Sequence, residues 1–401
     1  MSKIMVLPGT AWQIPLIKRI KEYGHEVYIV NPIKNSGVFE LADHHFDSDI
    51  FAIDDIEKYA REQMIDAIIS DECDIAMPVV SELGRRLGLN TLSNDAASLY
   101  TDKFYMREFS KQIGIQSIEY KLCMTVSDAL EFLRKLGKPV IIKPLDSNAS
   151  HGVFKADNET DILEHFDESM SFSRVTKAVL AERYITGTEF TIDGIKTPHS
   201  HYTLAISKKK HFKHNINIAN ELLFTHQCVK YDYDKLKKTN DLFVMNSPLQ
   251  YGFTHAEYKY ENGVFYLIEI GARGGGNMIS SIITQYMSGY DTYKYLIDCS
   301  LGNVFDTEFL IDSEHKDKAA VLKFFSTPQG GGEVIAIEGL DFLDTEPDIR
   351  AYKFNFKIGD EIIEAKNDSA RIGFYVACSE NLEKLKNVMK VVEDKVKIRV
   401  K

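Results

Sequence analysis

The chain lacks a long apolar segment, a basic excess and clustered cysteines, and each absence removes a class of protein. No apolar run approaches the roughly 18 residues that cross a bilayer, and the N-terminus shows no signal-peptide pattern. We therefore expect a cytoplasmic protein with no membrane partner. The net charge of −11 argues against nucleic acid as a partner, because phosphate contacts need a basic face. The five cysteines show no metal-ligand spacing, so we expect reduced thiols.

Two common nucleotide-binding motifs are also missing. The turn at 8–13 lacks a full dinucleotide fingerprint, and the loop at 145–153 does not fit the Walker A spacing. With 401 residues, 44% of them hydrophobic, the chain has material for two to three domains that each bury a core. Strands and helices alternate over residues 1–100, which predicts a parallel α/β unit.

The most informative stretch is a hairpin with an acidic residue on each strand. Residues 256–260 and 264–270 are rich in aromatic and β-branched residues, and the loop 261–263 joins them. Glu257 lies in the first strand and Glu269 in the second. Mg²⁺ takes one or two carboxylates and completes its shell with water and phosphates. A shared face for these two carboxylates therefore predicts a magnesium site.

The length of the loop decides whether the acids share a face. A three-residue loop puts Glu257 opposite Leu267 and diagonal to Glu269. A two-residue turn instead puts Glu257 opposite Ile268 and sends Glu269 to the other face. The metal site requires the longer loop, in which His255 lies opposite Glu269. The alternative is that both acids face water on an edge hairpin.

Cations and small residues accompany the hairpin. Arg273 follows Glu269 by four residues, and the glycines at 274–276 let a backbone approach a phosphate or carboxylate closely. Upstream, the apolar run 138–144 delivers Lys143 to a loop of small residues whose N–H groups can wrap phosphates. A strand-end lysine in solvent is the alternative reading of Lys143.

A polar hinge separates two apolar strands between residues 178 and 193. Glu182 and Glu189 stand at the two ends of this hinge. A crossing backbone supplies the donor and acceptor that an adenine edge needs, and Glu189 can bind a ribose. Taken alone, the segment also fits a plain hairpin.

In this order, from Asp102-Lys103 to Arg273, the features resemble the ATP-grasp superfamily, in its carboxylate–amine ligase (L-amino-acid ligase-like) branch. The resemblance extends over nearly the whole chain. It implies an α/β and α+β fold: an ATP-grasp domain at 101–310 with a mobile lid at about 116–181. A Rossmann-like parallel α/β domain at 1–100 precedes it. A small C-terminal α+β domain at 311–401 follows, which closes over the site and supports a homodimer.

The resemblance also assigns roles to individual residues. The nucleotide-binding set that it implies is Lys103, Lys143, Ser147, Ser150, His151, Gly152, Val153, Glu182, Arg183, Tyr184, Ile185 and Glu189. Glu257 and Glu269 match the metal acids, and Arg273 and Lys143 match catalytic cations. The substrate candidates are Arg273, Gly275, Gly276, Asn277 and His255. Gly271 departs from the pattern, because many members have an Asn there that completes the magnesium shell. A water or Asn277 takes its place.

The activity implied is an ATP-dependent ligase that joins a carboxylate to an amine through an acyl phosphate. The cofactors are ATP and Mg²⁺, with Mn²⁺ as an alternative metal. The partners are a small-molecule carboxylate and amine, with an amino acid as the acid, the amine or both. Two alternatives stay open. One is a carboxylase or purine-pathway-type ligase of the same superfamily, and the other is a regulator that holds ATP without turning it over.

The remaining segments of the chain carry expectations of their own. The basic cluster at 208–214 is expected to be a solvated loop, and residues 197–254 are expected to set substrate choice. Residues 9–13 and 71–74 are candidates for the substrate pocket, with ordinary strand-to-helix turns as the alternative. The helices between 278 and 300 are expected to be core. No nucleophile, base or ligand set is apparent after residue 313.

Overall fold

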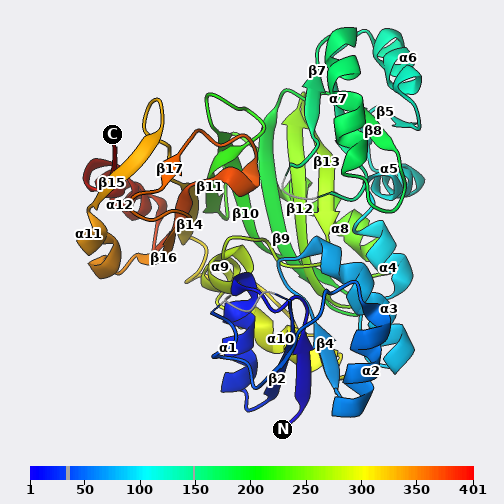
Figure 1. The fold of residues 1–401 in the computed structure, drawn as a ribbon, viewed down its shortest axis with the longest axis vertical. Coiled ribbons are helices and arrows are strands. Elements are labelled where there is room, and N and C mark those ends of the chain that lie inside the picture. Colours follow the sequence, from blue (N-terminus) through cyan, green and yellow to red (C-terminus); the bar gives the residue numbers. More distant parts are fainter. Residues whose placement is uncertain (33–36, 148–149) are drawn as a thin grey trace.

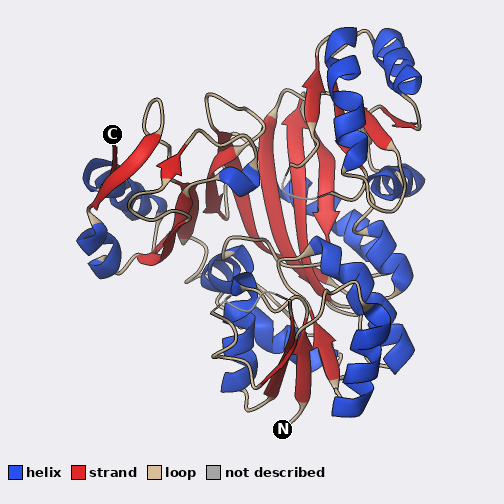
Figure 2. Cartoon of the chain, in the orientation of Figure 1, coloured by secondary structure: helices blue, strands red, loops and turns tan. Residues whose placement is uncertain are grey.

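The structure is a computed structural model that describes residues 1–32, 37–147 and 150–401. Figures 1 and 2 show a parallel α/β unit at one end, a long central sheet, and a helix-covered layer at the opposite end of that sheet. The expected combination of α/β and α+β parts is confirmed. Within the described residues, no helix combines the length and the apolar character that a membrane span needs.

The N-terminal part is built on a parallel sheet of order β3-β2-β1-β4. Apart from the edge strand at 44–46, its strands are short, largely apolar runs that are mostly buried, as expected where helices cover a parallel sheet. The strands are β1 Lys3–Val6, β2 Glu26–Val30, β3 His44–Phe46 and β4 Ala67–Ile69. The helices are η1 Ala11–Gln13, α1 Ile14–Glu22, α2 Ile53–Gln63, η2 Asp74–Ala76 and α3 Met77–Leu87.

The segment expected to form a lid is a separate antiparallel sheet of order β5-β8-β6-β7. Helices α4 Asn94–Leu99 and α5 Lys103–Gln112 lead into it. Its elements are β5 Tyr120–Cys123, α6 Val126–Leu136, β6 Val140–Pro144, β7 Phe154–Ala156, α7 Glu159–Ser171 and β8 Val179–Arg183. Apolar residues of α6 and α7 share one core with the sheet.

The central sheet has eight strands in the order β13-β12-β9-β10-β11-β14-β18-β16. The strands are β9 Thr188–Lys196, β10 His201–His211, β11 Ala219–Thr225, β12 Gly252–Glu261, β13 Val264–Gly271, β14 Ala319–Phe324, β16 Ile349–Phe354 and β18 Gly373–Ser379. The associated helices are α8 Tyr233–Asn246, η3 Ile279–Ile283, α9 Thr284–Ser288 and α10 Thr292–Ser300. The sheet therefore continues across the predicted limit at residue 310, and the domain limits stay a prediction.

The C-terminal part adds a small sheet of order β17-β15-β19. Its elements are β15 Gly332–Glu338, α11 Leu340–Thr345, β17 Glu361–Ile362, η4 Asp368–Ala370, α12 Leu382–Lys395 and β19 Lys397–Val400. Helix α12 packs on β14 and β18 through Leu385, Val388 and Val392. Beside the N-terminal sheet, α1 and α10 share one core. These shared cores hold groups from distant parts of the chain in fixed positions.

Candidate active site

The acidic hairpin closes with a two-residue turn, so the predicted three-residue loop is wrong. Asn262 and Gly263 both have positive φ, 51° and 84°, as a type I′ turn requires. Glu261 accordingly pairs with Val264. Asparagine and glycine adopt the left-handed region at little cost, which explains why the tight turn forms.

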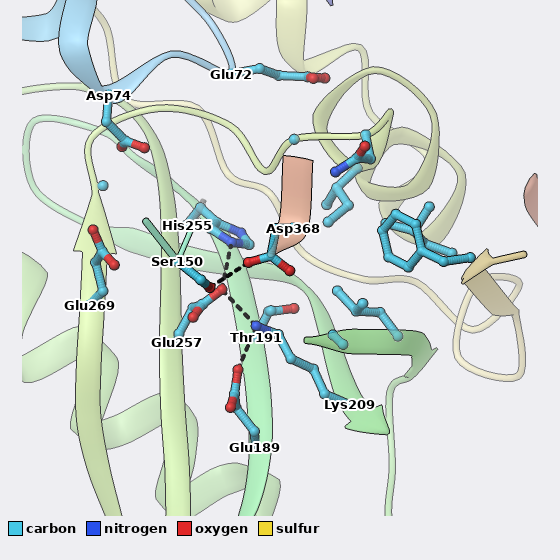
Figure 3. Close-up of a pocket in the computed structure, with 18 of the residues that line it drawn as sticks. Glu72, Asp74, Ser150, Glu189, Thr191, Lys209, His255, Glu257, Glu269 and Asp368 are labelled. Carbon is cyan, nitrogen blue, oxygen red and sulfur yellow. Dashed lines mark hydrogen bonds and ion pairs between the residues drawn. The ribbon is translucent and has the colours of Figure 1, made fainter. Parts of the chain in front are cut away.

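A β-bulge restores the shared face that the tight turn would otherwise remove. Tyr258 of β12 pairs with Leu267 of β13, but its neighbour Glu257 pairs with Glu269. Ile268 is therefore the extra residue of the bulge. The two carboxylate-bearing residues lie directly opposite each other and line one pocket (Figure 3).

Arg107 of α5 supports the bulge from behind. Its guanidinium donates to the Ile268 carbonyl over 2.6 Å and to Glu182 over 2.5 Å. The Arg107 side chain is only 1% exposed. The sequence does not point to this residue, because its contact to the bulge joins positions 161 apart in the chain. No local pattern carries such a signal.

The facing carboxylates fit a Mg²⁺ that carries nucleotide phosphates. Burial opposes ionisation of Glu257, but the Lys209 ammonium and the nearby His255 ring hold the pKa of Glu257 well below its usual range. Glu269 contacts Lys103 Nζ at 2.9 Å. Among the described residues, no group of three or more His, Cys, Asp or Glu is placed to hold a metal. Two carboxylates suit a metal whose other ligands are water and phosphate oxygens.

The glycine at position 271 has a steric reason. A Cβ there would lie 2.7 Å from Asp74 Oδ1 and 3.3 Å from Arg273 Nε. An asparagine would therefore push apart an ion pair. Asn277 lines the same pocket as Glu257, and its role as a replacement ligand stays a prediction.

The basic cluster at 208–214 is not a solvated loop, so that prediction is wrong. Its first four residues belong to β10, and Lys209 points into the site with 8% of its side chain exposed. Lys209 Nζ lies 2.6 Å from both Glu189 and Glu257 (Figure 3). Although burial opposes it, this ammonium lowers the pKa of Glu189 to about 2. The missed signal was strand periodicity, which places every second residue of the cluster on the site face.

A cavity of about 130 Å³ lies where the lid strands meet the central sheet. The nucleotide candidates that line it are Lys103, Lys143, Ser147, Ser150, Val153, Glu182, Arg183, Tyr184, Ile185 and Glu189. His151 and Gly152 are not among its lining residues, and residues 148 and 149 of the same loop lie outside the described residues. Glu257 and Glu269 also line this cavity, so the two carboxylates border the candidate nucleotide site.

The two candidate phosphate lysines are buried and paired. Lys103 Nζ donates to the Ser147 carbonyl over 2.8 Å, beside its contact with Glu269. Lys143 Nζ lies 2.6 Å from Glu182. Burial lowers the pKa of Lys143 to about 8, and the charge of Glu182 only partly opposes this shift. The Lys143 ammonium therefore loses its charge nearer to neutral pH than a lysine in water does.

We expect the affinity for Mg-ADP to fall above about pH 8. Because the pKa of Lys143 is lowered, its positive charge is complete below that pKa and is lost as the pH rises through it. Losing one charged contact weakens binding about tenfold. Calorimetric titration between about pH 7 and pH 9 measures this. A Lys143→Arg variant keeps its charge and should show a flat profile; a flat wild-type profile would contradict the assignment.

Arg273 is tied to the N-terminal part of the chain. Its guanidinium pairs with Asp74 through two hydrogen bonds of 2.8 and 2.7 Å. Asp74 and Glu72, from the candidate stretch 71–74, line a second pocket together with Gly276 and Asn277. In Figure 3, Glu72 and Asp74 lie at one end of this pocket, and Lys209 and Glu189 lie at the other. Residues 9–13 are not among its lining residues.

The predicted position of His255 opposite a metal acid is wrong, because it pairs with Gly271. Its Nδ1 lies 2.7 Å from Asp193, and its Nε2 lies 3.9 Å from Glu257. Burial opposes protonation, but Asp193 raises the pKa of His255. Gly275 lies against this histidine: a Cβ there would be 2.8 Å from Nδ1. Gly275 therefore allows close packing and is not a lining residue of the pocket.

The C-terminal part reaches the site, although no site residue was predicted there. Asp368 and Arg371 line the second pocket. Ser150 Oγ belongs to the loop at 145–153, the candidate phosphate loop, and donates to Asp368 over 2.5 Å. His151 Nε2 of the same loop lies 3.2 Å from Ser369 Oγ. The phosphate loop is thus in contact with η4, a segment more than 200 residues away in the chain.

Family comparisons match two stretches of the chain. Residues 136–281 match the model described as the ATP-grasp domain, and residues 324–401 match the model described as L-amino acid ligase C-terminal domain 2. The solved structure of an L-amino acid ligase from Bacillus licheniformis superimposes with a TM-score of 0.86 at 19% identity. That superposition covers 100% of this chain and 99% of the other, and it shows a shared fold.

Relatives with similar sequences match this chain over only part of their own length. Alanine–anticapsin ligase of Bacillus subtilis is 29% identical over 312 residues, which cover 68% of this chain and 64% of that protein. Phosphoribosylamine–glycine ligase of Methanosphaera stadtmanae is 26% identical over 202 residues, 47% of this chain and 45% of that protein. The chain therefore spans less than two thirds of the length of either relative.

Proposed function

Since the chain belongs to the ATP-grasp superfamily, we propose that it is an ATP-dependent carboxylate–amine ligase with an amino acid substrate. The main support is the facing pair Glu257 and Glu269, which lines both the nucleotide cavity and the second pocket. A phosphate in the first and a carboxylate in the second would meet at this pair. The names of the amino acid ligase relatives support the same substrate class.

The residues of the chain have separable roles in this reaction. Lys103 and Lys143 would bind nucleotide phosphates, and Arg273, oriented by Asp74, would bind the substrate carboxylate. Glu257 and Glu269 would hold Mg²⁺, which neutralises phosphate charge when it is bound. A carboxylate oxygen attacks the γ-phosphorus of ATP and ADP leaves, giving an acyl phosphate. The amine then attacks the acyl carbon and phosphate leaves, so no protein nucleophile is needed.

The test supplies purified protein with Mg-ATP and a panel of paired acids and amines. We expect ADP and phosphate to be released only when an acid is present, and hydroxylamine to trap the acyl phosphate as a hydroxamate. Absence of phosphate release across the panel would reject the proposal. Carboxylated product from labelled bicarbonate would indicate the carboxylase alternative, and tight ATP binding without turnover would indicate the regulator.

Other expectations rest on the resemblance alone. The domain limits near residues 100 and 310, the mobility of the lid at about 116–181, the homodimer and the use of Mn²⁺ stay predictions. The contacts from Ser150 to Asp368 and from His151 to Ser369 support a C-terminal part that closes over the phosphate loop.

A further inference from the structure

The contacts described for the two facing acids fall on one carboxylate oxygen of each. Glu257 Oε1 lies 2.6 Å from Lys209 Nζ and 3.9 Å from His255 Nε2. Glu269 Oε1 lies 2.9 Å from Lys103 Nζ. Within the part of the chain that the structure describes, no hydrogen bond or ion pair reaches the Oε2 of either acid. One oxygen from each of two carboxylates is a set that suits a single Mg²⁺, whose shell water and phosphates complete.

The space for a further metal ligand, two residues after Glu269, is filled. A Cβ at position 271 would lie 2.7 Å from Asp74 Oδ1, so a side chain there would displace this carboxylate. Asp74 is itself engaged, because Arg273 donates to both of its oxygens. Among the described residues, no set of three or more acids, histidines or cysteines is placed to hold a metal. Two single oxygens are a small ligand set for a two-metal site, in which the ions lie about 3.5–4 Å apart.

Lys209 places a fixed positive charge at the same acids. Its Nζ lies 2.6 Å from Glu189 Oε1 and 2.6 Å from Glu257 Oε1, and 8% of the side chain is exposed. An ammonium this deeply buried needs charged partners, and here two carboxylates supply them. Both acids line both cavities, and Lys209 lines the second pocket. The ammonium therefore lies where the nucleotide cavity and the second pocket meet (Figure 3).

We propose that Lys209 is a catalytic cation that takes the place of a second metal ion, and that the acid pair holds one Mg²⁺ per nucleotide. This inference rests on the proposed ligase function. In the transfer, the bond from the γ-phosphorus to the ADP oxygen breaks as the bond to the substrate carboxylate oxygen forms, and charge spreads over the phosphoryl oxygens. The Lys209 ammonium stabilises that charge, keeps its proton and forms no covalent bond. Its two carboxylate partners hold it in position before the nucleotide binds.

Counting bound metal tests the single metal ion without any turnover. Mn²⁺ replaces Mg²⁺ as the probe, the β,γ-imido analogue of ATP is the nucleotide, and electron paramagnetic resonance measures free and bound Mn²⁺. We expect one bound Mn²⁺ per bound nucleotide, with a spectrum that shows no coupling between metal ions. Two bound ions per nucleotide, or the coupling that ions about 3.5–4 Å apart produce, would overturn the one-metal site.

A Lys209→Met variant tests the catalytic cation. With hydroxylamine as the trap, it should lower the kcat for hydroxamate formation by roughly 10²–10³-fold, because one charge that faces the transferring phosphoryl group is lost. Lys209→Arg keeps the charge and should be at least about tenfold faster than Lys209→Met. The affinity for Mg-ADP, which lacks the transferring group, should not weaken in either variant. A distorted site would weaken it in both.

Lys210→Met is the matched control. Lys210 follows Lys209 on β10, but 60% of its side chain is exposed and it pairs with Glu221 at 2.7 Å. This variant should keep the wild-type rate. Equal rates for Lys209→Met and Lys210→Met, or weaker Mg-ADP binding in Lys209→Met, would overturn the catalytic role of Lys209. Absence of both ADP and hydroxamate from the wild type with every acid would overturn the ligase function, whereas the Mn²⁺ count would still decide the number of metal ions.

Discussion

Glu257→Gln and Glu269→Gln are each expected to lower ATP turnover by roughly 10²–10³-fold. The two residues are cross-strand partners that border both cavities. Each substitution removes one of the two carboxylates that we propose to hold the Mg²⁺ of the nucleotide. Glutamine keeps the shape of the side chain and most of its hydrogen bonding. Phosphate release at saturating ATP, followed over a range of Mg²⁺ concentrations, measures the effect and should show a raised Mg²⁺ requirement.

Glu62→Gln is the control for these two variants, because the Glu62 side chain is exposed on α2. It should retain the wild-type rate. Retention of more than about one tenth of wild-type turnover by both site variants would show that the acid pair does not hold the metal, since the loss of such electrostatic stabilisation costs more than that.

Arg107→Met is expected to lower the free energy of unfolding by about 3–5 kcal/mol. Arg107 and Glu182 are 1% and 3% exposed, and their ion pair is 2.5 Å long. Methionine fills part of the space but leaves the Ile268 carbonyl without its donor and Glu182 with Lys143 alone. Because the bulge depends on this contact, affinity for Mg-ADP should fall as well. Chemical denaturation and calorimetric titration measure the two effects.

The matched control is Arg61→Met. Arg61 pairs with Glu57 at 2.7 Å, but 55% of its side chain is exposed. Exposed pairs contribute at most about 1 kcal/mol, so this variant should unfold almost as the wild type does. Equal stability of Arg107→Met and Arg61→Met would mean that Arg107 is not a support of the site.

The order of elements was predictable because it follows from local patterns. Short apolar runs and the helices between them indicated the parallel α/β unit, of which the strand Glu26–Val30 is an example. The acidic hairpin was also readable, but its register was not. The tight Asn262-Gly263 turn and the bulge at Ile268 shift the register in compensating ways, and the bulge depends on Arg107 from another element. The predicted loop was one residue too long, and the bulge was not predicted. These two errors compensate, so the prediction that Glu257 and Glu269 share a face is still correct.

The sequence by itself determined the fold class, the succession of nucleotide and acidic motifs, and the residues that could carry charge. The strands, the helices and the acidic hairpin follow from periodicity and turn chemistry, which act over a few neighbouring residues. The fold class follows from the resemblance of the ordered motifs to the ATP-grasp superfamily. Only the tertiary structure decided which charges meet. Lys209 lies between two acids, Asp74 pairs with Arg273, and Asp368 accepts a hydrogen bond from Ser150. Those contacts join remote segments through packing, and packing leaves no local mark in a single sequence.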